Sequence, residues 1–96
     1  MITEFAEIAV KPGTEQQFID GVEALKLLFA RAVGCHGMEL HHSIEQPGHF
    51  VLLVKWESVA DHMEKFQKSA DFEVWRAKVG PFFEGRPKVW HSNTVV

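Results

Sequence analysis

The segment that most constrains the fold is His49–Trp56, because it is apolar on both faces of an extended chain. Side chains of a strand point alternately to its two faces. Val51 and Leu53 make one face apolar, and the other face carries four larger apolar side chains, Phe50, Leu52, Val54 and Trp56. Such a strand needs cover on both sides. In a chain of 96 residues the helices can cover one side, so we expect a second copy to cover the other.

Turn residues divide the rest of the chain into strand and helix patterns. Pro12-Gly13, Gln46-Pro47-Gly48 and Gly80-Pro81 are typical of turns and helix ends. Between them, apolar residues recur with a period of two or at helical spacing. The expected elements are a strand at Ile2–Val10, a helix from Thr14 to about Val33, strands at Met38–Glu45 and His49–Trp56, helical pieces beginning at Ser58 and Ser69, and a strand at Pro87–Val96.

Capping residues predict where the helices begin. Thr14 occupies the N-cap position of the first helix, and Gln17 completes a capping box with it. Ser58 and Asp61 resemble a capping box with Asp in place of Glu, and the short helix that follows is expected to bury Val59, Met63 and Phe66. Ser69 starts a second helical piece, whose apolar face is Phe72, Trp75 and Val79.

The order strand, helix, strand, strand, helix, strand predicts an α+β fold. It is the ferredoxin-like split βαβ sandwich, in which helices cover one face of a four-stranded antiparallel sheet. One domain over residues 1–96 is expected, since the chain is too short for two hydrophobic cores. The uncovered sheet face, which carries Val51 and Leu53, predicts a homodimer that joins through this face.

Charge and composition argue against several classes of partner. The net charge is −3, and the ten Lys and Arg residues are scattered, so we expect no nucleic-acid partner. No apolar run approaches the roughly 20 residues that span a bilayer, so we expect no membrane partner. The single Cys35 cannot form an internal disulfide, and no secretory leader opens the chain. These features favour the cytoplasm.

His62 is the strongest candidate for a polar catalytic group. His62 and Phe66 are four residues apart, so on a helix they share one face and can point into one pocket. An imidazole can accept a proton and donate a hydrogen bond near neutral pH. The alternative is that His62 holds the helix against the sheet through a hydrogen bond. One of His41 and His42 is also expected to face the pocket.

Metal binding and thiol chemistry are not favoured by the same criteria. His41 and His42 are adjacent on a strand and point to opposite faces, and no Cys or carboxylate completes a ligand pattern around them, so we expect no metal. Cys35 and His36 lie in a glycine-flanked loop without a group that orients them. We therefore expect an ordinary thiol rather than a nucleophile.

Short motifs spread along nearly the whole chain resemble one known family. In chain order they are Glu7-Ile8 before Lys11-Pro12-Gly13, Ser43-Ile44-Glu45 before Pro47-Gly48, Trp56-Glu57-Ser58, Asp61-His62-Met63, Phe66 with Ser69 and Phe72, and Gly80-Pro81-Phe82. Their order and spacing are similar to those of the antibiotic biosynthesis monooxygenases, which are dimeric α+β barrel proteins. This family includes quinol and polyketide oxygenases, haem-degrading enzymes and members of no known activity, so the resemblance alone does not define a function.

The resemblance implies that a ligand lies between the sheet and the helices of each subunit. The polyketide oxygenases carry an asparagine and a tryptophan at the positions of His62 and Phe66, so both residues have changed here. The implied reaction uses a small aromatic phenol or quinol and dioxygen, without a cofactor. His62 and Arg76 are the candidate catalytic residues. The candidate substrate-binding residues are Glu4, His42, Phe66, Phe72, Trp75 and His91.

Three other functions fit the same fold. The chain could be a binding or dimerisation module without oxygen chemistry, which the loss of the asparagine and the tryptophan favours. It could be an isomerase of the muconolactone type, because such an enzyme needs only proton transfer. Haem degradation is disfavoured, because the positions of that family's histidine, asparagine and tryptophan are here Arg76, Glu4 and Phe66.

Overall fold

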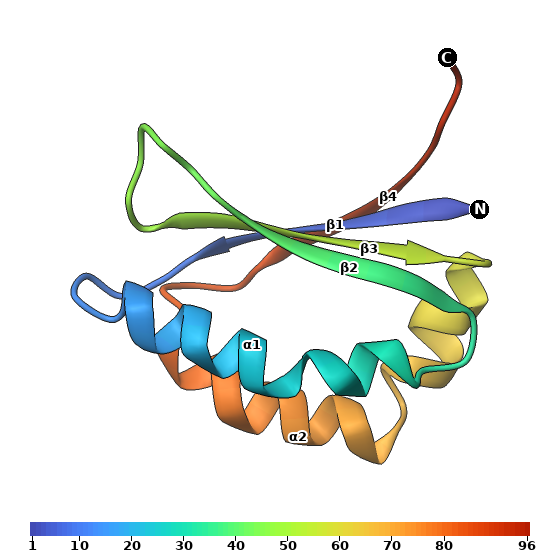
Figure 1. Ribbon diagram of the computed structural model, residues 1–96, viewed down its shortest axis with the longest axis horizontal. Helices are drawn as coiled ribbons and strands as arrows, with labels where there is room; N and C mark the ends of the chain where they lie inside the picture. The colour runs from blue at the N-terminus through green and yellow to red at the C-terminus, as the bar shows by residue number, and fades with distance from the viewer.

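The computed structural model describes all 96 residues and arranges them in two layers (Figure 1). Both helices lie on the same face of a four-stranded sheet, and the two chain termini lie at the same end of the molecule. This arrangement confirms the α+β sandwich. In chain order the elements are β1 (Ile2–Ala9), α1 (Glu15–Ala30), β2 (Cys35–His42), β3 (His49–Trp56), a π-helix (Asp61–Phe66), α2 (Ala70–Val79), a 3-10 turn (Gly80–Phe82) and β4 (Lys88–Asn93).

The strand order in the sheet is β2-β3-β1-β4, and every neighbouring pair is antiparallel. β1 and β3 are therefore the central strands, and β4 is an edge strand. Glu4 of β1 lies opposite Val54 of β3 on one side and opposite His91 of β4 on the other. Since paired residues share a face of the sheet, this register brings Glu4 and His91 together from opposite ends of the chain.

The hydrophobic core fills the space between the sheet and the helices. Phe18 of α1 packs edge-on against Phe50 of β3, with ring centroids 4.9 Å apart, and Phe29 packs against Trp75 of α2 at 4.8 Å. Full burial of one such side chain contributes about 1.5–3 kcal/mol. The 14 buried hydrophobic residues form one cluster: Ala6, Ile8, Val10, Phe18, Val22, Leu28, Phe29, Phe50, Leu52, Val54, Trp56, Phe66, Trp75 and Val79.

The opposite face of the sheet has no helix over it (Figure 1). Phe5 of β1 stacks on Trp90 of β4, with ring centroids 4.5 Å apart and planes 13° apart. Trp90 is 43% exposed, and Val51 and Leu53 of β3 are half-buried. The expectation that one sheet face is left bare and partly apolar is therefore confirmed.

Strand β2 differs from its prediction at both ends. It spans Cys35–His42 rather than Met38–Glu45. A bulge between Cys35 and Gly37 extends its pairing with β3 toward the end of α1. At the other end Ser43 joins a turn, where its Oγ accepts a hydrogen bond from the backbone N–H of Gln46 at 3.0 Å. Ile44 is therefore 93% exposed, and the predicted strand extends too far toward the C-terminus.

The first helix does not begin with a capping box. The Thr14 hydroxyl donates to the carbonyl of Lys11 at 2.6 Å, within the Pro12-Gly13 turn, and makes no hydrogen bond to the helix. Thr14 is the N-cap residue of α1 as predicted, and its carbonyl accepts a hydrogen bond from the backbone N–H of Phe18 at 2.9 Å. The predicted capping box with Gln17 is wrong. The hydroxyl is used in the turn instead of the helix. α1 also ends at Ala30, short of the predicted Val33.

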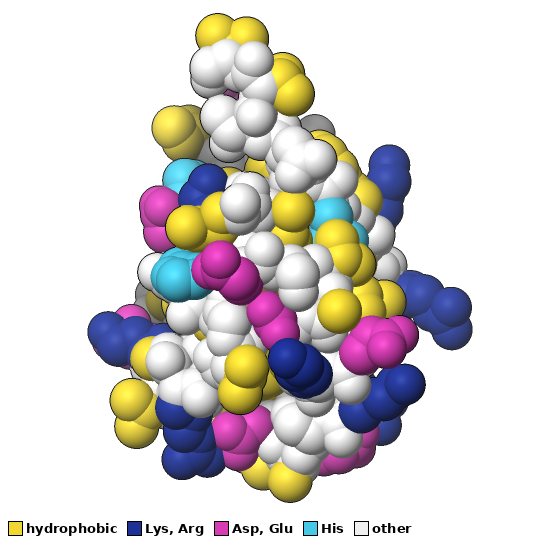
Figure 2. All heavy atoms as spheres, turned by 90° about the vertical axis from the view of Figure 1, so that its right-hand side faces the viewer, with side chains coloured by type: hydrophobic (Ala, Val, Ile, Leu, Met, Phe, Trp, Pro, Cys, Tyr) yellow, Lys and Arg dark blue, Asp and Glu magenta, His cyan; other side chains and the backbone are white.

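The last strand is shorter than predicted, because its pairing with β1 ends at Asn93 opposite Ile2. The prediction of a strand to Val96 is therefore wrong for its last three residues. Val95 and Val96 are 88% and fully exposed, respectively. Figure 2 shows this end as a projection of uncharged and hydrophobic side chains, whereas charged side chains gather over the helical layer below.

Candidate active site

A cavity of about 290 Å³ lies between the sheet and the helices. This is near the lower end of the range for ligand sites, about 300–1,000 Å³, so it suits a small ring compound. Nine of the fifteen lining residues are hydrophobic. The complete lining is Glu4, Ala6, Ile8, Phe29, Leu52, His62, Phe66, Gln67, Phe72, Trp75, Arg76, Phe83, Arg86, Pro87 and Val89.

A π-helix and the residue that follows it carry three of the lining residues. The backbone N–H of Gln67 donates to the carbonyl of His62 at 2.9 Å, which is the i to i+5 bond of a π-helix. His62, Phe66 and Gln67 all reach the cavity from this segment. The expected apolar face of Val59 and Met63 is wrong, because these side chains are 43% and 38% exposed. Of the three predicted residues, only Phe66 is buried.

The start of the π-helix is fixed by contacts at Asp61. Its backbone N–H donates to the Ser58 hydroxyl at 3.2 Å, which confirms Ser58 as the capping residue. Its carboxylate pairs with Lys65 at 2.9 Å. A Cβ atom placed on Gly34 would meet the Asp61 carboxylate and its Cβ, so only glycine fits beside it. These contacts set the orientation of His62, the next residue.

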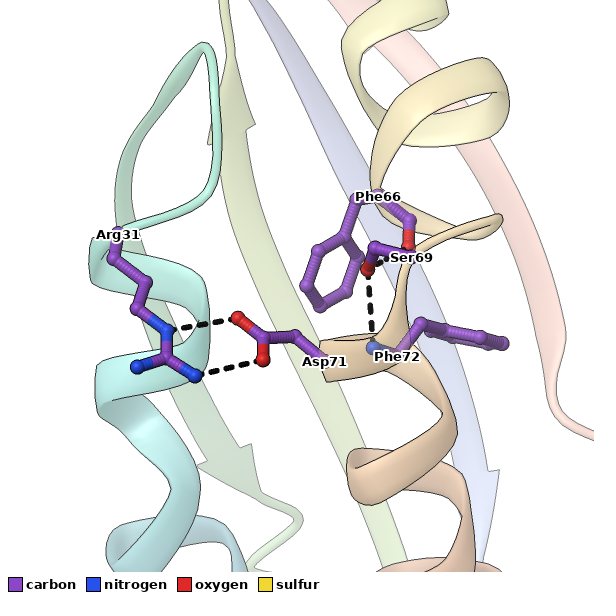
Figure 3. A network of polar contacts seen from close by, with 5 residues as sticks. All are labelled: Arg31, Phe66, Ser69, Asp71 and Phe72. Atoms are coloured by element: carbon purple, nitrogen blue, oxygen red, sulfur yellow. Dashed lines mark hydrogen bonds and ion pairs between the residues drawn. The ribbon is translucent and has the colours of Figure 1, made fainter.

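The second helical piece is held at its start by two polar contacts (Figure 3). Ser69 is the N-cap of α2 as predicted, and its hydroxyl accepts from the backbone N–H of Phe72 at 3.1 Å. Arg31, at the end of α1, makes two hydrogen bonds to the Asp71 carboxylate, at 2.8 and 2.7 Å. The contact with Arg31 holds the pKa of Asp71 below its usual range. Together they position Phe72 at the cavity wall.

A buried polar cluster forms one end of the cavity. The indole N–H of Trp56 donates to Oε1 of Glu4 at 2.9 Å. Nε2 of His62 lies 3.3 Å from the same oxygen, and Nδ1 of His62 lies 2.9 Å from Nε2 of His91. Glu4 and His62 are 4% and 2% exposed, whereas His91 is half-buried on the edge strand. The His62 ring also stacks on Trp56, 5.3 Å between centroids.

Burial favours the neutral forms of Glu4 and His62, so it raises the pKa of Glu4 and lowers the pKa of His62. Loss of solvent raises the pKa of Glu4 to about 7, against the opposing effect of the Trp56 hydrogen bond. Loss of solvent, and next the charge of His91, lower the pKa of His62 to about 4. Near neutral pH His62 is therefore uncharged and Glu4 exchanges a proton readily. Although their atoms are close enough for an ion pair, the two groups are not both charged.

The second carboxyl oxygen of Glu4 is available to a ligand. Both protein contacts use Oε1, and Oε2 makes no hydrogen bond within the chain. No buried side-chain nitrogen or oxygen lacks a partner, so Oε2 is an accessible atom. Because Glu4 lines the cavity, that access is from the cavity. A carboxyl group with a pKa near 7 and one free oxygen can take a proton from a bound hydroxyl group.

The structure brings together most of the predicted site residues. Six of them line the cavity, namely Glu4, His62, Phe66, Phe72, Trp75 and Arg76. His91 does not line it but contacts His62. His42 does not belong to the site, because it stacks on Phe50 at 4.1 Å and lines a separate hollow between α1 and β2. Its neighbour His41 lies opposite Val51, on the uncovered sheet face.

Sequence reasoning missed three residues that bring polar groups to the site, Trp56, Gln67 and Arg86. Trp56 was assigned to the core, and its hydrogen bond to Glu4 depends on the pairing of β1 with β3. Gln67 directly follows the π-helix, which the sequence pattern did not predict. Arg86 follows the last turn, where no periodic pattern exists. The one sequence signal for a buried polar cluster was Glu4, a charged residue among the apolar residues on that face of β1.

Three of the four remaining histidines have local partners. His36 contacts Glu57, His41 contacts Glu39, and Nε2 of His42 lies 2.6 Å from the carbonyl oxygen of Pro47. No group of three or more histidine, cysteine or acidic side chains is placed to hold a metal ion. Cys35 is half-buried and contacts the Gly37 carbonyl, and burial raises the pKa of its thiol. None of the helices has the length and apolar character needed to cross a membrane.

Comparison with known proteins agrees with this architecture. A family model described as antibiotic biosynthesis monooxygenase matches residues 1–78. The chain belongs to this family. The uncharacterized protein YczJ of Bacillus subtilis is a relative, 30% identical over 95 residues, which are 99% of this chain and all of YczJ.

Two solved structures show how closely the family fold is kept. A candidate antibiotic biosynthesis monooxygenase from Bordetella bronchiseptica is 48% identical, with a TM-score of 0.97 over 99% of this chain and 97% of that one. A second candidate from Nitrosomonas europaea is 18% identical, with a TM-score of 0.85 over the full length of both chains. The second likeness concerns the fold alone.

Proposed function

We propose that the protein is a small cofactor-independent monooxygenase that oxidises a phenolic or quinol-type aromatic compound in the cavity. The observation that carries this proposal is the Glu4 carboxyl, which is buried in an aromatic-walled cavity with one oxygen held and the other open. Membership in the antibiotic biosynthesis monooxygenase family supports the reaction class. The shape and apolar walls of the cavity support a planar aromatic substrate.

The first step is the removal of a proton from the substrate. A phenol placed at the polar end gives its proton to Oε2 of Glu4. The resulting phenolate is stabilised by the hydrogen bond that the protonated Oε2 of Glu4 donates back to it, while His62, whose ring nitrogens contact Glu4 and His91, holds the carboxyl in place. Because most of the wall is apolar, few solvent contacts stabilise the negative charge, and the ring is electron-rich. In this role His62 orients Glu4, and Glu4 takes the proton.

The second step uses this electron-rich ring to reduce dioxygen. One electron passes to dioxygen, and the two radicals join as a peroxide on a ring carbon that carries one hydrogen. Glu4 returns the proton to the peroxide, and water leaves together with the hydrogen of that carbon. In total the phenol loses its O–H and one ring C–H hydrogen, and with O₂ it becomes a quinone, with a new C=O group, and H₂O. No further oxidant, reductant or cofactor is needed for this balance.

A proton-transfer isomerase is the second candidate, and the paired Glu4 and His62 favour it. An isomerase needs one group that removes a proton from carbon and one that supplies a proton, and these two residues could serve both roles. Such an enzyme would consume no oxygen. The two candidates therefore differ in a quantity that is simple to measure.

Oxygen uptake tests the proposal directly. We expect the protein to consume dioxygen with aromatic phenols or quinols in buffer that contains a metal chelator, and Glu4→Gln to reduce kcat at least about a hundredfold, as for loss of a general base. Glu45→Gln is the matched control, because Glu45 is exposed and lies outside the cavity. Turnover by Glu4→Gln at the rate of the unaltered protein would contradict the role of Glu4. Substrate conversion without oxygen uptake would favour the isomerase.

We also propose that two copies associate through the uncovered sheet face. Phe5, Val51, Leu53 and Trp90 give this face an apolar centre. Around it lie paired polar groups, such as Lys55, which donates to Thr3 at 2.9 Å. An apolar centre with a polar rim is the usual arrangement of a protein interface. The homodimer would leave each cavity within its own subunit, on the other side of the sheet.

A further inference from the structure

The cavity has two chemically different ends. Glu4 and Ile8 both line it from β1, and four residues of extended chain separate them by about 13 Å. The polar cluster lies at the Glu4 end. The walls between the two ends are apolar, so a ligand that fills the cavity lies along β1 with its two ends in different surroundings.

Two arginines line the Ile8 end. Arg86 is two residues after Glu84, whose backbone N–H donates to the carbonyl of Ala9. It is two residues before Lys88, which lies opposite Glu7 in the sheet. Arg86 is therefore beside the C-terminal half of β1. Arg76 is in the last part of α2, where its Cγ would be 3.9 Å from a Cβ placed on Gly80. Both guanidinium groups belong to exposed residues, so they lie at the mouth of the cavity.

No acidic side chain of the cavity lining lies beside the two arginines at the mouth. Glu4 is the only acidic residue in the lining, and it is at the other end. Arg76 is paired with Glu73 on its own helix at 3.1 Å, and Arg86 makes no ion pair. The lining thus carries two cations in a chain whose net charge is −3. Glu7 and Glu84 line a neighbouring hollow together with Arg86 and Lys88, but neither forms an ion pair with Arg86, so the donors of its guanidinium are free for an anionic ligand.

We infer that Arg76 and Arg86 form an anion subsite, and that the substrate is an aromatic acid whose hydroxyl group lies at Glu4 and whose carboxylate lies at the arginines. The orientation of the hydroxyl rests on the proposed function, but the anion subsite does not. Arg86 contributes more than Arg76, because Glu73 already occupies part of the Arg76 guanidinium. Guanidinium groups suit carboxylates, since they can donate two parallel hydrogen bonds.

The test is a binding measurement in the absence of oxygen, with two probes of nearly equal size. These are 6-hydroxy-2-naphthoic acid, which has a hydroxyl and a carboxylate at opposite ends, and its neutral primary amide. We expect the unaltered protein to bind the acid about tenfold more tightly than the amide. Arg86→Gln should remove most of this preference without changing the affinity for the amide. Arg76→Gln should do so to a smaller extent, and added salt should weaken the preference.

Lys11→Gln is the matched control, because it changes the net charge by the same amount at the same end of the molecule, outside the cavity lining. It should leave both affinities unchanged. Equal affinity of the unaltered protein for acid and amide, including failure of both to bind, would overturn the inference. An effect of Lys11→Gln as large as that of Arg86→Gln would also overturn it.

The same probes separate this inference from the proposed function. If the acid binds preferentially but no dioxygen is consumed when air is admitted, the anion subsite stands and the monooxygenase does not. If acid and amide bind equally and both are oxidised, the monooxygenase stands and the anion subsite does not.

Discussion

Glu4 is an acid that the fold holds in an environment favouring its neutral form. Its folded-state pKa of about 7 is above the ordinary value of 4.5, so ionisation costs stability as the pH rises between these values. His62 is the reverse case, with a folded-state pKa of about 4 against 6.5. The stability that comes from its neutral ring is lost as the pH falls through this range. Between pH 4.5 and 6.5 the two effects oppose each other.

Glu4→Gln should expose this balance. We expect the free energy of unfolding of the parent protein to change little between pH 4.5 and 6.5, and that of Glu4→Gln to rise over the same range, because only His62 still titrates there. Between pH 4 and pH 8 the free energy of unfolding of the variant should increase by on the order of 3 kcal/mol more than that of the parent. Urea unfolding at several pH values measures this. Parallel curves for parent and variant would contradict it, and Glu45→Gln should follow the parent.

Trp56 opposes the effect of burial on Glu4, since its indole donates to Oε1 and lowers the pKa of the carboxyl. Trp56→Phe keeps a ring in the core but removes the donor. We expect the pKa of Glu4 to rise further above about 7 and the optimum of any base-dependent turnover to move to higher pH. Carbon-13 NMR of the Glu4 carboxyl would follow the titration. An unchanged or lower pKa would show that the indole has no such role.

Helices and strands were predicted correctly from the sequence where the spacing of apolar residues alone determines the structure. β1, β3, the buried face of α1 and the Ser69 start of α2 follow from spacing and capping alone. The failures occur where a polar side chain has a local alternative. The Thr14 hydroxyl bonds in its turn, Ser43 starts a turn, and the π-helix depends on contacts at Asp61 that no spacing rule contains. His42 shares the helix-facing side of β2 with Met38 and Leu40 as predicted, but β2 is an edge strand, and these residues line a separate hollow.

Gly34→Ala should test how far the π-helix depends on its neighbouring loop. Gly34 has a φ of +78°, and a Cβ there would lie 2.9 Å from Cβ of Asp61, so rotation of the carboxylate alone gives no relief. Gly13 has a similar φ of +85° but nothing within 4 Å of its Cβ position, which makes Gly13→Ala the control. We expect losses of about 1–2 kcal/mol for Gly13→Ala and about 3 kcal/mol for Gly34→Ala. Urea unfolding measures both, and equal losses would mean that the contact at Asp61 is unimportant.

For the whole molecule, the pattern of strands and helices was enough to predict the architecture and the bare sheet face. It was not enough to assemble the polar cluster. Glu4 and His91 meet because β1 pairs with β4, and Trp56 reaches Glu4 because β1 also pairs with β3. Pairing partners and register are tertiary facts, and a period of two gives only the face on which each residue lies. The site is therefore a property of the sheet, although its most visible residue, His62, is on a helix.

The bare face leads to a prediction about assembly. The molecule extends 35 by 34 Å in its two longer directions, which leaves room for the roughly 800 Å² that each partner contributes to a stable interface. Leu53 lies between Phe5 and Glu39 on this face, so Leu53→Lys places a charge near its apolar centre. We expect light scattering to show a dimer for the parent and a monomer for Leu53→Lys, with an unchanged circular dichroism spectrum.

Val74→Lys is the control for this experiment, because it makes the same kind of substitution at a half-exposed position on α2, away from the sheet. It should remain a dimer. A parent protein that is monomeric at micromolar concentration would show that the uncovered face is tolerated in water. If Leu53→Lys stays dimeric while Val74→Lys dissociates, the copies meet through their helices instead. That outcome would bring α2, which carries Arg76, to the interface.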